Sequence, residues 1–334
     1  MKSGRLNKIT DVAGVKVGHY TVNSPEHHTG VTVIVPSPNF IFQHKLTAAC
    51  AVLNGFGKTQ GLVQMDEQGT LETPIALTNT LNVGKVHDAL VEYTVDQARK
   101  YGVPVRSVNP VVGECNDSAL NRITERILGI PEVMQAIESA CEDFAEGDVG
   151  AGKGTSCFGL KGGIGSASRM FTVGGETYTL GVLVQSNFGS TQDLRIDGQP
   201  IGREIAAVIQ KSEPDKGSIM IIAATDLPVT DRQLRRIVKR AGVGLARLGS
   251  YWGHGSGDVV IGFSTAQSFQ EAEEAGTLSV RMLNEEYINE PFRAMAEATE
   301  EAVLHSMLAA GAVGDRRSLK EFLQKNGNFS GVVL

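Results

Sequence analysis

The chain has 334 residues, of which 41% are hydrophobic and 20% are charged. These proportions are typical of a globular protein with a large core, and they exclude a disordered, coiled-coil or collagen-like chain. The formal net charge of −6 argues against a nucleic-acid-binding protein, which would carry a basic surface. Glycine is unusually common: the chain has 39, which is about 12% against the usual level of about 7%.

The sequence indicates a cytoplasmic protein with reduced thiols. No stretch approaches the 18 consecutive apolar residues that a membrane helix needs, and the first 14 residues lack the apolar core of a signal peptide. No two of the four cysteines lie within four residues of each other, which excludes a CxxC redox motif or a zinc knuckle. The seven histidines form no HExxH motif, so no metal site is predicted.

Apolar runs and breaking residues predict the elements of the first half. Short runs of β-branched residues with alternating pattern indicate strands, and apolar residues at helical spacing indicate helices. In chain order these are strands over 14–20 and 30–35, a helix over 47–53, a strand over 74–78, and helices over 86–101, 116–127 and 131–144.

The second half begins with ten glycines among the 29 residues Gly147–Gly175. After it the same patterns predict a strand over 177–185, a helix over 202–211, a polar break over 212–217, a strand over 218–224, a helix over 231–248, a strand over 258–264, a helix over 284–310 kinked at Pro291, and a helix over 318–325. Strands and helices come in clusters rather than in strict alternation, which favours an α+β fold with sheets layered against helices.

The glycine-rich segment has more than one interpretation. Residues 147–153 spell GxxxxGK, as in a phosphate-binding loop, but Gly154 stands where such a loop needs Ser or Thr. The segment also follows a predicted helix, whereas a phosphate-binding loop follows a strand. The remaining alternatives are tight turns with close backbone packing, or a loop that shapes an active site.

Ser218 stands at the junction of a polar turn and the most hydrophobic predicted strand, directly after Gly217. The ordinary interpretation is a serine at the edge of a strand. If the preceding peptide bond were cleaved, the free α-amine of Ser218, with a pKa of about 8, could serve as the general base for its own hydroxyl. Glycine before the serine would leave the scissile carbonyl unshielded.

Ordered blocks over residues 9–266 resemble the L-aminopeptidase/D-esterase family, which includes the β-peptidyl aminopeptidases. The glycine-rich signature GAGKGTSCFGLKGGIGSASRM covers 150–170, and further matches include NPVVGECND at 109–117, VQSNFG at 184–189 and GSIMIIAATDLP at 217–228. The resemblance implies a four-layer αββα sandwich, with two packed sheets flanked by helices, as a single domain over 1–334. It also implies self-cleavage between Gly217 and Ser218 into chains 1–217 and 218–334.

The resemblance assigns roles to particular residues. Ser218 would be the nucleophile, and Asn187 would donate a hydrogen bond to the oxyanion. Ser256 and Asp258, in the motif GSGD, would hydrogen-bond near the nucleophile and orient its amine, and Glu114 would pair with the free amino group of the substrate. Without the resemblance, Asn187 is interpreted as a turn residue, Ser256 and Asp258 as a cap or hairpin corner, and Glu114 as a surface charge.

The sequence therefore predicts a self-processing serine aminopeptidase. It would hydrolyse an amide, with an ester as the open alternative, next to a free amine in a small peptide or amino-acid derivative. No metal or organic cofactor is implied, and the family implies a homo-oligomer, a tetramer of processed heterodimers. The alternatives are an acyltransferase of the ornithine acetyltransferase type or a linear-amide oligomer hydrolase, both of which typically use threonine, and an unprocessed binding protein.

Overall fold

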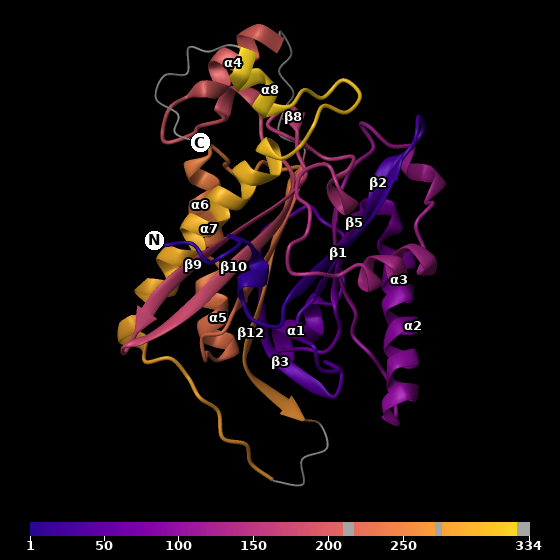
Figure 1. The fold of residues 1–334 in the computed structure, drawn as a ribbon, viewed down its shortest axis with the longest axis vertical. Coiled ribbons are helices and arrows are strands. Elements are labelled where there is room, and N and C mark those ends of the chain that lie inside the picture. Colours follow the sequence, from indigo (N-terminus) through magenta and orange to yellow (C-terminus); the bar gives the residue numbers. More distant parts are fainter. Residues whose placement is uncertain (210–216, 271–275, 326–334) are drawn as a thin grey trace.

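The computed structural model describes residues 1–209, 217–270 and 276–325. Its larger sheet has six strands in the order β4-β3-β12-β11-β10-β9, in which β11 and β12 run parallel and the other neighbours run antiparallel (Figure 1). The strands are β3 (His44–Gly55), β4 (Thr70–Leu71), β9 (Ile164–Val173), β10 (Glu176–Asn187), β11 (Ser218–Thr225) and β12 (Gly257–Gln270).

The second sheet has four strands in the order β1-β2-β5-β6, and a small hairpin, β7-β8, lies apart from both sheets. The strands of the second sheet are β1 (Lys16–Asn23), β2 (His28–Val35), β5 (Ile75–Asn79) and β6 (Val111–Cys115), and those of the hairpin are β7 (Ser156–Cys157) and β8 (Leu160–Lys161). Because β5 and β6 run parallel, a crossover joins them, and helix α2 lies within it.

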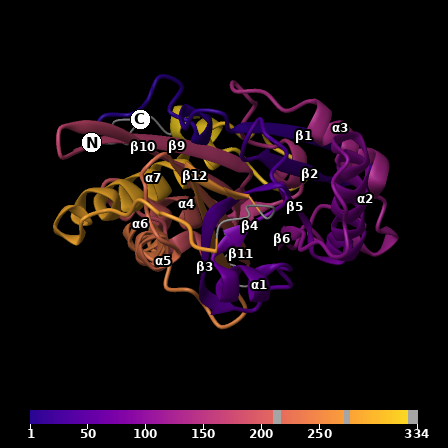
Figure 2. The same ribbon diagram turned by 90° about the horizontal axis from the view of Figure 1, so that it is seen from below.

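Helices cover the outer face of each sheet. The described α-helices are α1 (Leu62–Gln68), α2 (Val83–Tyr101), α3 (Ile130–Glu138), α4 (Ile201–Ile209), α5 (Asp231–Val238), α6 (Ala241–Arg247), α7 (Asn289–Leu308) and α8 (Leu319–Lys325). In Figure 2, α2 and α3 lie outside the four-stranded sheet, and α5, α6 and α7 lie outside the six-stranded one. None of the described helices is long and apolar enough to cross a membrane.

Three apolar clusters separate the layers. One lies between the two sheets and includes Ile75 and Met220, the second joins the six-stranded sheet to α5–α7, and the third joins the four-stranded sheet to α2 and α3. The order is therefore helices, sheet, sheet, helices, which confirms the predicted αββα sandwich. Alternate residues of β11 contribute to different clusters, since Met220 faces the other sheet whereas Ile219 and Ile221 face the helices.

The prediction of a helix over 47–53 is wrong, because this run is the middle of strand β3. Ala48 and Cys50 pack between the sheets, while Ala49 and Ala51 pack against the helix layer. A strand that is buried on both faces has an unbroken apolar sequence, which periodicity alone does not distinguish from a buried helix.

The prediction of a helix over 116–127 is also wrong, since only a single 3-10 turn forms there, at Ile123–Glu125. The Ser118 N–H donates to Asn116 Oδ1 at 3.0 Å, and such local side-chain bonds compete with a helix. Arg126 has a φ of +49°, which ends the turn.

Two predicted helices have other bounds. The helix predicted over 231–248 is two helices, α5 and α6, and the one predicted over 131–144 ends at Glu138. Pro291 does not kink α7, because it lies in the first turn, where a missing N–H costs nothing. The predicted polar break over 212–217 lies outside the described residues except for Gly217.

Close backbone packing accounts for much of the glycine-rich segment. A Cβ atom on Gly163 would lie 2.2 Å from the carbonyl oxygen of Gly147, and one on Gly165 would lie 2.0 Å from that of Ala302 in helix α7. Side chains at these positions would push apart the backbone segments that meet there. The Lys153 ammonium of the GxxxxGK sequence lies 2.7 Å from the Asp148 carboxylate, so an acidic neighbour already pairs with it.

Candidate active site

Ser218 is the first residue of the central strand β11 and is almost fully buried. On one side it lies opposite Asn187, the last residue of β10, and on the other side opposite Gly257, the first residue of β12. Because side chains alternate along a strand, Ser218 shares with Met220 the face that is turned toward the second sheet. The structure therefore places Ser218 between two of the predicted site segments.

Gly217 is packed too tightly for any other residue type. A Cβ atom at this position would lie 1.7 Å from the carbonyl oxygen of Asn187. The Gly217 carbonyl oxygen accepts a hydrogen bond from the Gly257 N–H at 3.2 Å. That bond polarises the carbonyl group of the predicted scissile peptide and fixes its orientation.

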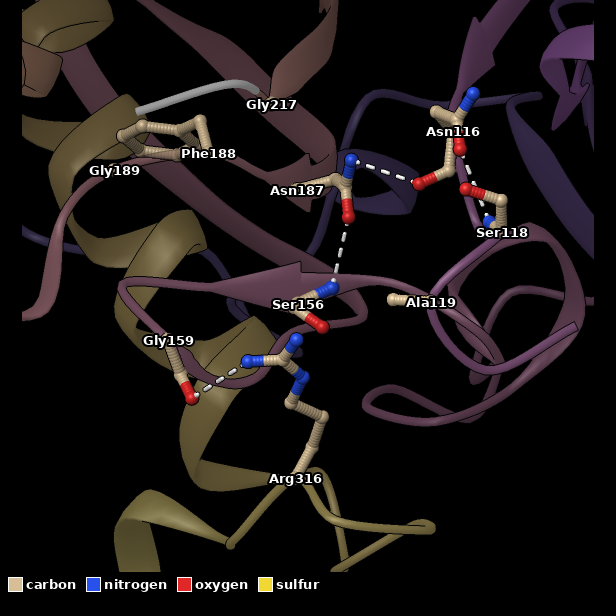
Figure 3. A pocket seen from close by; sticks show the side chains of 10 residues that line it. All are labelled: Asn116, Ser118, Ala119, Ser156, Gly159, Asn187, Phe188, Gly189, Gly217 and Arg316. Atoms are coloured by element: carbon tan, nitrogen blue, oxygen red, sulfur yellow. Dashed lines mark hydrogen bonds between the residues drawn. The ribbon is translucent and has the colours of Figure 1, made fainter. Parts of the chain in front are cut away.

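The Asn187 amide is held from two directions at the end of β10 (Figure 3). Its Oδ1 accepts from the Ser156 N–H at 2.9 Å, and its Nδ2 donates to the Asn116 carbonyl at 3.0 Å. An amide NH₂ has two hydrogens, so one is left to donate to a ligand. The two backbone contacts also establish which end of the amide is the donor, as an oxyanion contact requires.

Ser256 and Asp258 flank Gly257, the residue paired with Ser218. The Ser256 hydroxyl donates to Asp258 Oδ1 at 2.7 Å, and both side chains are buried. The Asn54 Nδ2 donates to the carbonyls of Ser256 and Gly253, which holds this turn against β3. The predicted pair is thus formed, and it lies beside the backbone at the start of β11.

Glu114 is buried near the end of strand β6, in the other sheet, rather than exposed as a surface charge. Its Oε1 accepts from the Lys58 N–H at 2.9 Å, and its Oε2 accepts from the Thr80 hydroxyl. A Cβ on Gly57 would lie 3.7 Å from both Glu114 Oε1 and Gly257 Cα, so the carboxylate lies beside β12.

The chain from Glu114 to Asn116 crosses over the start of β11. Glu114 lies beside β12, the Cys115 thiol contacts the Ser218 carbonyl at 3.5 Å, and the Asn116 carbonyl accepts from Asn187 on β10. Burial raises the pKa of Cys115 well above its usual value, which keeps it a thiol. Three consecutive residues thus approach the three neighbouring strands around Ser218.

A cavity of about 170 Å³ opens beside Asn187, the last residue of β10, and Gly217 (Figure 3). It is lined by Asn116, Ser118, Ala119, Ser156, Gly159, Asn187, Phe188, Gly189, Gly217 and Arg316. Gly217 and Asn187 were predicted for the site, whereas Ser218, Glu114, Ser256 and Asp258 do not line this cavity.

The other eight lining residues were missed by the sequence analysis, and three of these contribute to the geometry of the site. Asn116 and Ser156 hold Asn187 through backbone atoms, so their residue types carry no signal for this contact. Arg316 lies beyond residue 266, where the family blocks end, and nothing in the sequence distinguishes it from other arginines.

Lys161 holds the segment that provides Ser156. It is fully buried, and its ammonium donates to the carbonyls of Gly152, Thr155 and Gly162 at 2.8, 2.9 and 2.7 Å. Burial lowers the pKa of Lys161 to about 7, while three acceptors favour the ammonium form, which alone has three donors. The lysine of the glycine-rich signature therefore cross-links its own loop.

Asp117 lies in the sequence between the lining residues Asn116 and Ser118, and it is buried without lining the cavity. Its Oδ1 accepts from Asn121 Nδ2 at 3.0 Å, and its carbonyl accepts from the Leu120 and Asn121 N–H groups. Burial raises the pKa of Asp117 to about 6, against the effect of its hydrogen bonds.

Within residues 1–209, 217–270 and 276–325, no group of three or more His, Cys, Asp or Glu side chains could hold a metal ion.

This arrangement has a serine hydroxyl, an amide donor opposite it, and a buried carboxylate on each sheet. A family model described as Peptidase family S58 matches residues 7–320. The chain belongs to peptidase family S58. This membership and the relatives below confirm the predicted enzyme class, a serine aminopeptidase.

Members of family S58 and solved structures resemble this chain over nearly its full length. β-Peptidyl aminopeptidase BapA of Sphingosinicella microcystinivorans is 37% identical over 333 residues, covering 92% of this chain and 83% of the relative. The PH0078 protein of Pyrococcus horikoshii OT3 is 45% identical with a TM-score of 0.90, covering 98% of this chain and 96% of that one.

The L-aminopeptidase D-Ala-esterase/amidase of Ochrobactrum anthropi is 33% identical with a TM-score of 0.89, covering 98% of this chain and 96% of that one. It is described as a prototype for the serine aminopeptidases and as a new variant among the Ntn hydrolase fold. This likeness agrees with the layer order found here and with the fold predicted from the sequence.

Proposed function

We propose that this S58 peptidase cleaves its own chain between Gly217 and Ser218 and then acts as an aminopeptidase through Ser218. The observation that carries the proposal is the register of the central strands. It places Ser218 opposite Asn187, whose amide is oriented by two backbone groups, and beside the Ser256–Asp258 pair. A nucleophile, an oxyanion donor and a polar pair near the future amine therefore meet at one strand end.

The first reaction is self-cleavage. The Ser218 Oγ attacks the carbonyl carbon of Gly217, the peptide C–N bond breaks, and the nitrogen takes the hydroxyl proton and becomes the α-amine of Ser218. Water then hydrolyses the resulting ester, which leaves a carboxylate on Gly217 and restores the Ser218 hydroxyl. The Gly257 N–H, 3.2 Å from the Gly217 carbonyl oxygen, supports the charge that develops there.

The second reaction is hydrolysis of a substrate. The α-amine of Ser218 has a pKa near 8 in an unperturbed chain, so it can accept the Oγ proton as the hydroxyl attacks. The second Nδ2 hydrogen of Asn187 donates to the oxyanion. The leaving amine takes the proton and departs, and water releases the acyl group from Ser218. The Ser256 hydroxyl and the Asp258 carboxylate orient the α-amine.

Glu114 binds the free amino group of the substrate. Its carboxylate is buried, is fixed by Lys58 and Thr80, and lies beside β12. A buried carboxylate favours a cationic partner strongly, since an unpaired buried charge is costly. We therefore propose short peptides, amino-acid amides or esters with a free amine as substrates, in line with the names of the relatives.

Replacement of Ser218 with Ala tests both reactions. Denaturing electrophoresis and intact-mass measurement should show chains of 217 and 117 residues for the wild type and one chain of 334 residues for the variant. Hydrolysis of a panel of α- and β-aminoacyl p-nitroanilides should be lost together with cleavage. Ser264→Ala is the matched control, because Ser264 is also buried in this sheet but lies at the other end of the β11–β12 pairing, opposite Thr225.

Two outcomes of this experiment would reject the proposal. One is an intact wild-type chain with no new N-terminus at Ser218. The other is a Ser218→Ala variant that still hydrolyses the p-nitroanilides. Both are independent of which aminoacyl group is preferred.

We also propose a homo-oligomer in the cytoplasm, a tetramer of processed heterodimers. The family resemblance supports it, and so do the exposed apolar side chains of Leu278, Val280 and Met282, which alternate along the segment after β12. Light scattering should give about four times the mass of one chain, and a single-chain mass would contradict the oligomer. Cell fractionation tests the location.

A further inference from the structure

The cavity beside Asn187 contains one permanent positive charge. In the uncleaved chain, Arg316 is the only ionisable residue among the described residues that line it, and its side chain is only 8% exposed. Its Nη1 donates to the Gly159 carbonyl at 3.5 Å, and its Nε lies 3.5 Å from the mostly exposed Asp315 carboxylate. Arginine does not lose its proton in proteins, so the cavity always carries this charge.

The backbone holds Arg316 firmly against the glycine-rich loop. Its N–H and C=O both pair with Val313, at 3.0 and 3.1 Å, and the next carbonyl, that of Arg317, accepts from the Lys161 N–H at 2.8 Å. Figure 3 shows the guanidinium rising toward Ser156, with Asn187 on the far side of that residue. The charge is therefore positioned before any ligand binds.

The sheet order defines which part of a substrate meets Arg316. Glu114 lies beside β12, Ser218 begins β11, and Asn187 ends β10, with Ser156 and Arg316 beyond it. A substrate with its amine at Glu114 and its scissile carbonyl at Ser218 and Asn187 directs its leaving group into this cavity. Arg316 therefore faces the leaving group and not the acyl group.

We propose that Arg316 binds the free carboxylate of a leaving group that is one small amino acid. The proposal rests on the proposed function, because it takes the acyl site at Ser218 as given. A guanidinium is the side chain best suited to a carboxylate, since it can form two parallel hydrogen bonds. The Ser156 hydroxyl on the cavity wall is buried and has no hydrogen-bond partner among the described residues, so it can add a contact.

The size of the cavity restricts the leaving group. About 170 Å³ is well below the 300–1,000 Å³ of typical ligand pockets. It suits a glycine or alanine, and a longer peptide would have to extend past the guanidinium. The preferred substrates are therefore dipeptides with a small second residue and a free C-terminus.

Paired substrates test the proposal in the purified enzyme. X-Gly and X-Gly-amide differ only in the carboxylate, where X is the aminoacyl group released fastest from the p-nitroanilide panel. The ratio of their kcat/KM values cancels differences in active-enzyme concentration between variants. We expect the wild type to prefer X-Gly by at least about tenfold, the effect of one charged hydrogen bond.

Three variants complete the experiment. Arg316→Gln should bring the ratio close to one, and Arg316→Lys should keep part of the preference. Arg317→Gln is the matched control, since it removes the same charge from the exposed neighbouring side chain and should keep the wild-type ratio.

A wild-type ratio near one, or an unchanged ratio in Arg316→Gln, would overturn the carboxylate site and leave the role of Ser218 intact. Loss of all hydrolysis in both Arg316 variants would also overturn it, because the residue would then be needed for the fold or for the acyl site. A wild type that cleaves neither the dipeptides nor the p-nitroanilides would instead reject the proposed function.

Discussion

The buried carboxyl group of Asp117 makes the free energy of unfolding of the protein depend on pH. Its pKa is raised from 3.8 to about 6 by burial. Between these values the folded protein holds a proton that the unfolded chain has released, so the free energy of unfolding falls as the pH rises through this window. Above pH 6 the Asp117 carboxylate is charged in the folded state, and its burial lowers the free energy of unfolding by about 3 kcal/mol, at about 1.36 kcal/mol per pKa unit.

The variant Asp117→Asn removes this cost while keeping the shape of the side chain. Its Oδ1 can still accept from Asn121 Nδ2. We expect the variant to be more stable than the parent at pH 8, by up to about 3 kcal/mol, and to be equally stable at pH 4. Urea unfolding at several pH values measures the difference, and both proteins should carry Ser218→Ala so that each remains a single chain.

Asp143 provides a control of opposite sign. It is fully exposed, and its hydrogen bond and ion pair with Lys8 at 2.6 Å lower its pKa. Asp143→Asn should therefore lose a little stability at pH 8, and this loss should disappear on acidification. A difference between Asp117→Asn and its parent that is independent of pH, or that favours the parent at pH 8, would refute the assignment of a buried, costly charge to Asp117.

Three further variants test the other parts of the site. Asn187→Ala should lower kcat by about 10²–10³, the effect of losing one oxyanion donor, and an unchanged steady-state kcat would exclude that role. Glu114→Gln should lower kcat/KM for substrates with a free amine by about tenfold or more, and equal kinetics in the two enzymes would contradict amine binding. Lys161→Met should lower the free energy of unfolding in urea by about 3 kcal/mol, because three buried carbonyls lose their donor. A smaller decrease than that caused by replacing an exposed lysine would contradict the cross-link.

Sequence patterns predicted the strands whose composition is unambiguous. The runs at 30–35 and 218–224 are rich in β-branched residues and are strands β2 and β11. The run at 47–53 was misassigned because its small residues are equally suited to a buried helix. Strand β9 was not predicted at all. Its first half, IGSAS, consists mostly of small residues, which allow close contact with α7 but have a low strand propensity. Long-range packing decided the structure of these segments.

For the candidate site too, the sequence predicted some features and missed others. Ser218, Asn187, Ser256, Asp258 and Glu114 were proposed from the motifs in which they lie, and they lie around the ends of β10, β11 and β12 together with β6. Glu114 was taken for a surface charge on its sequence alone, yet it is buried, because carboxylates are expected at the surface unless a specific contact is known.

The contacts that orient the Asn187 amide cannot be predicted from residue types. The Asn187 amide is held by the carbonyl of residue 116 and the N–H of residue 156, and almost any residue could provide either group. A backbone contact restricts the residue type only where there is no room for a side chain. This is the case at Gly217, where a Cβ atom would collide with the Asn187 carbonyl. A glycine in this region therefore indicates that two backbone segments lie in close contact. The excess of glycine and the lack of a signal at residues 116 and 156 have one physical cause. Main-chain atoms make many of the contacts that hold the candidate active site in place.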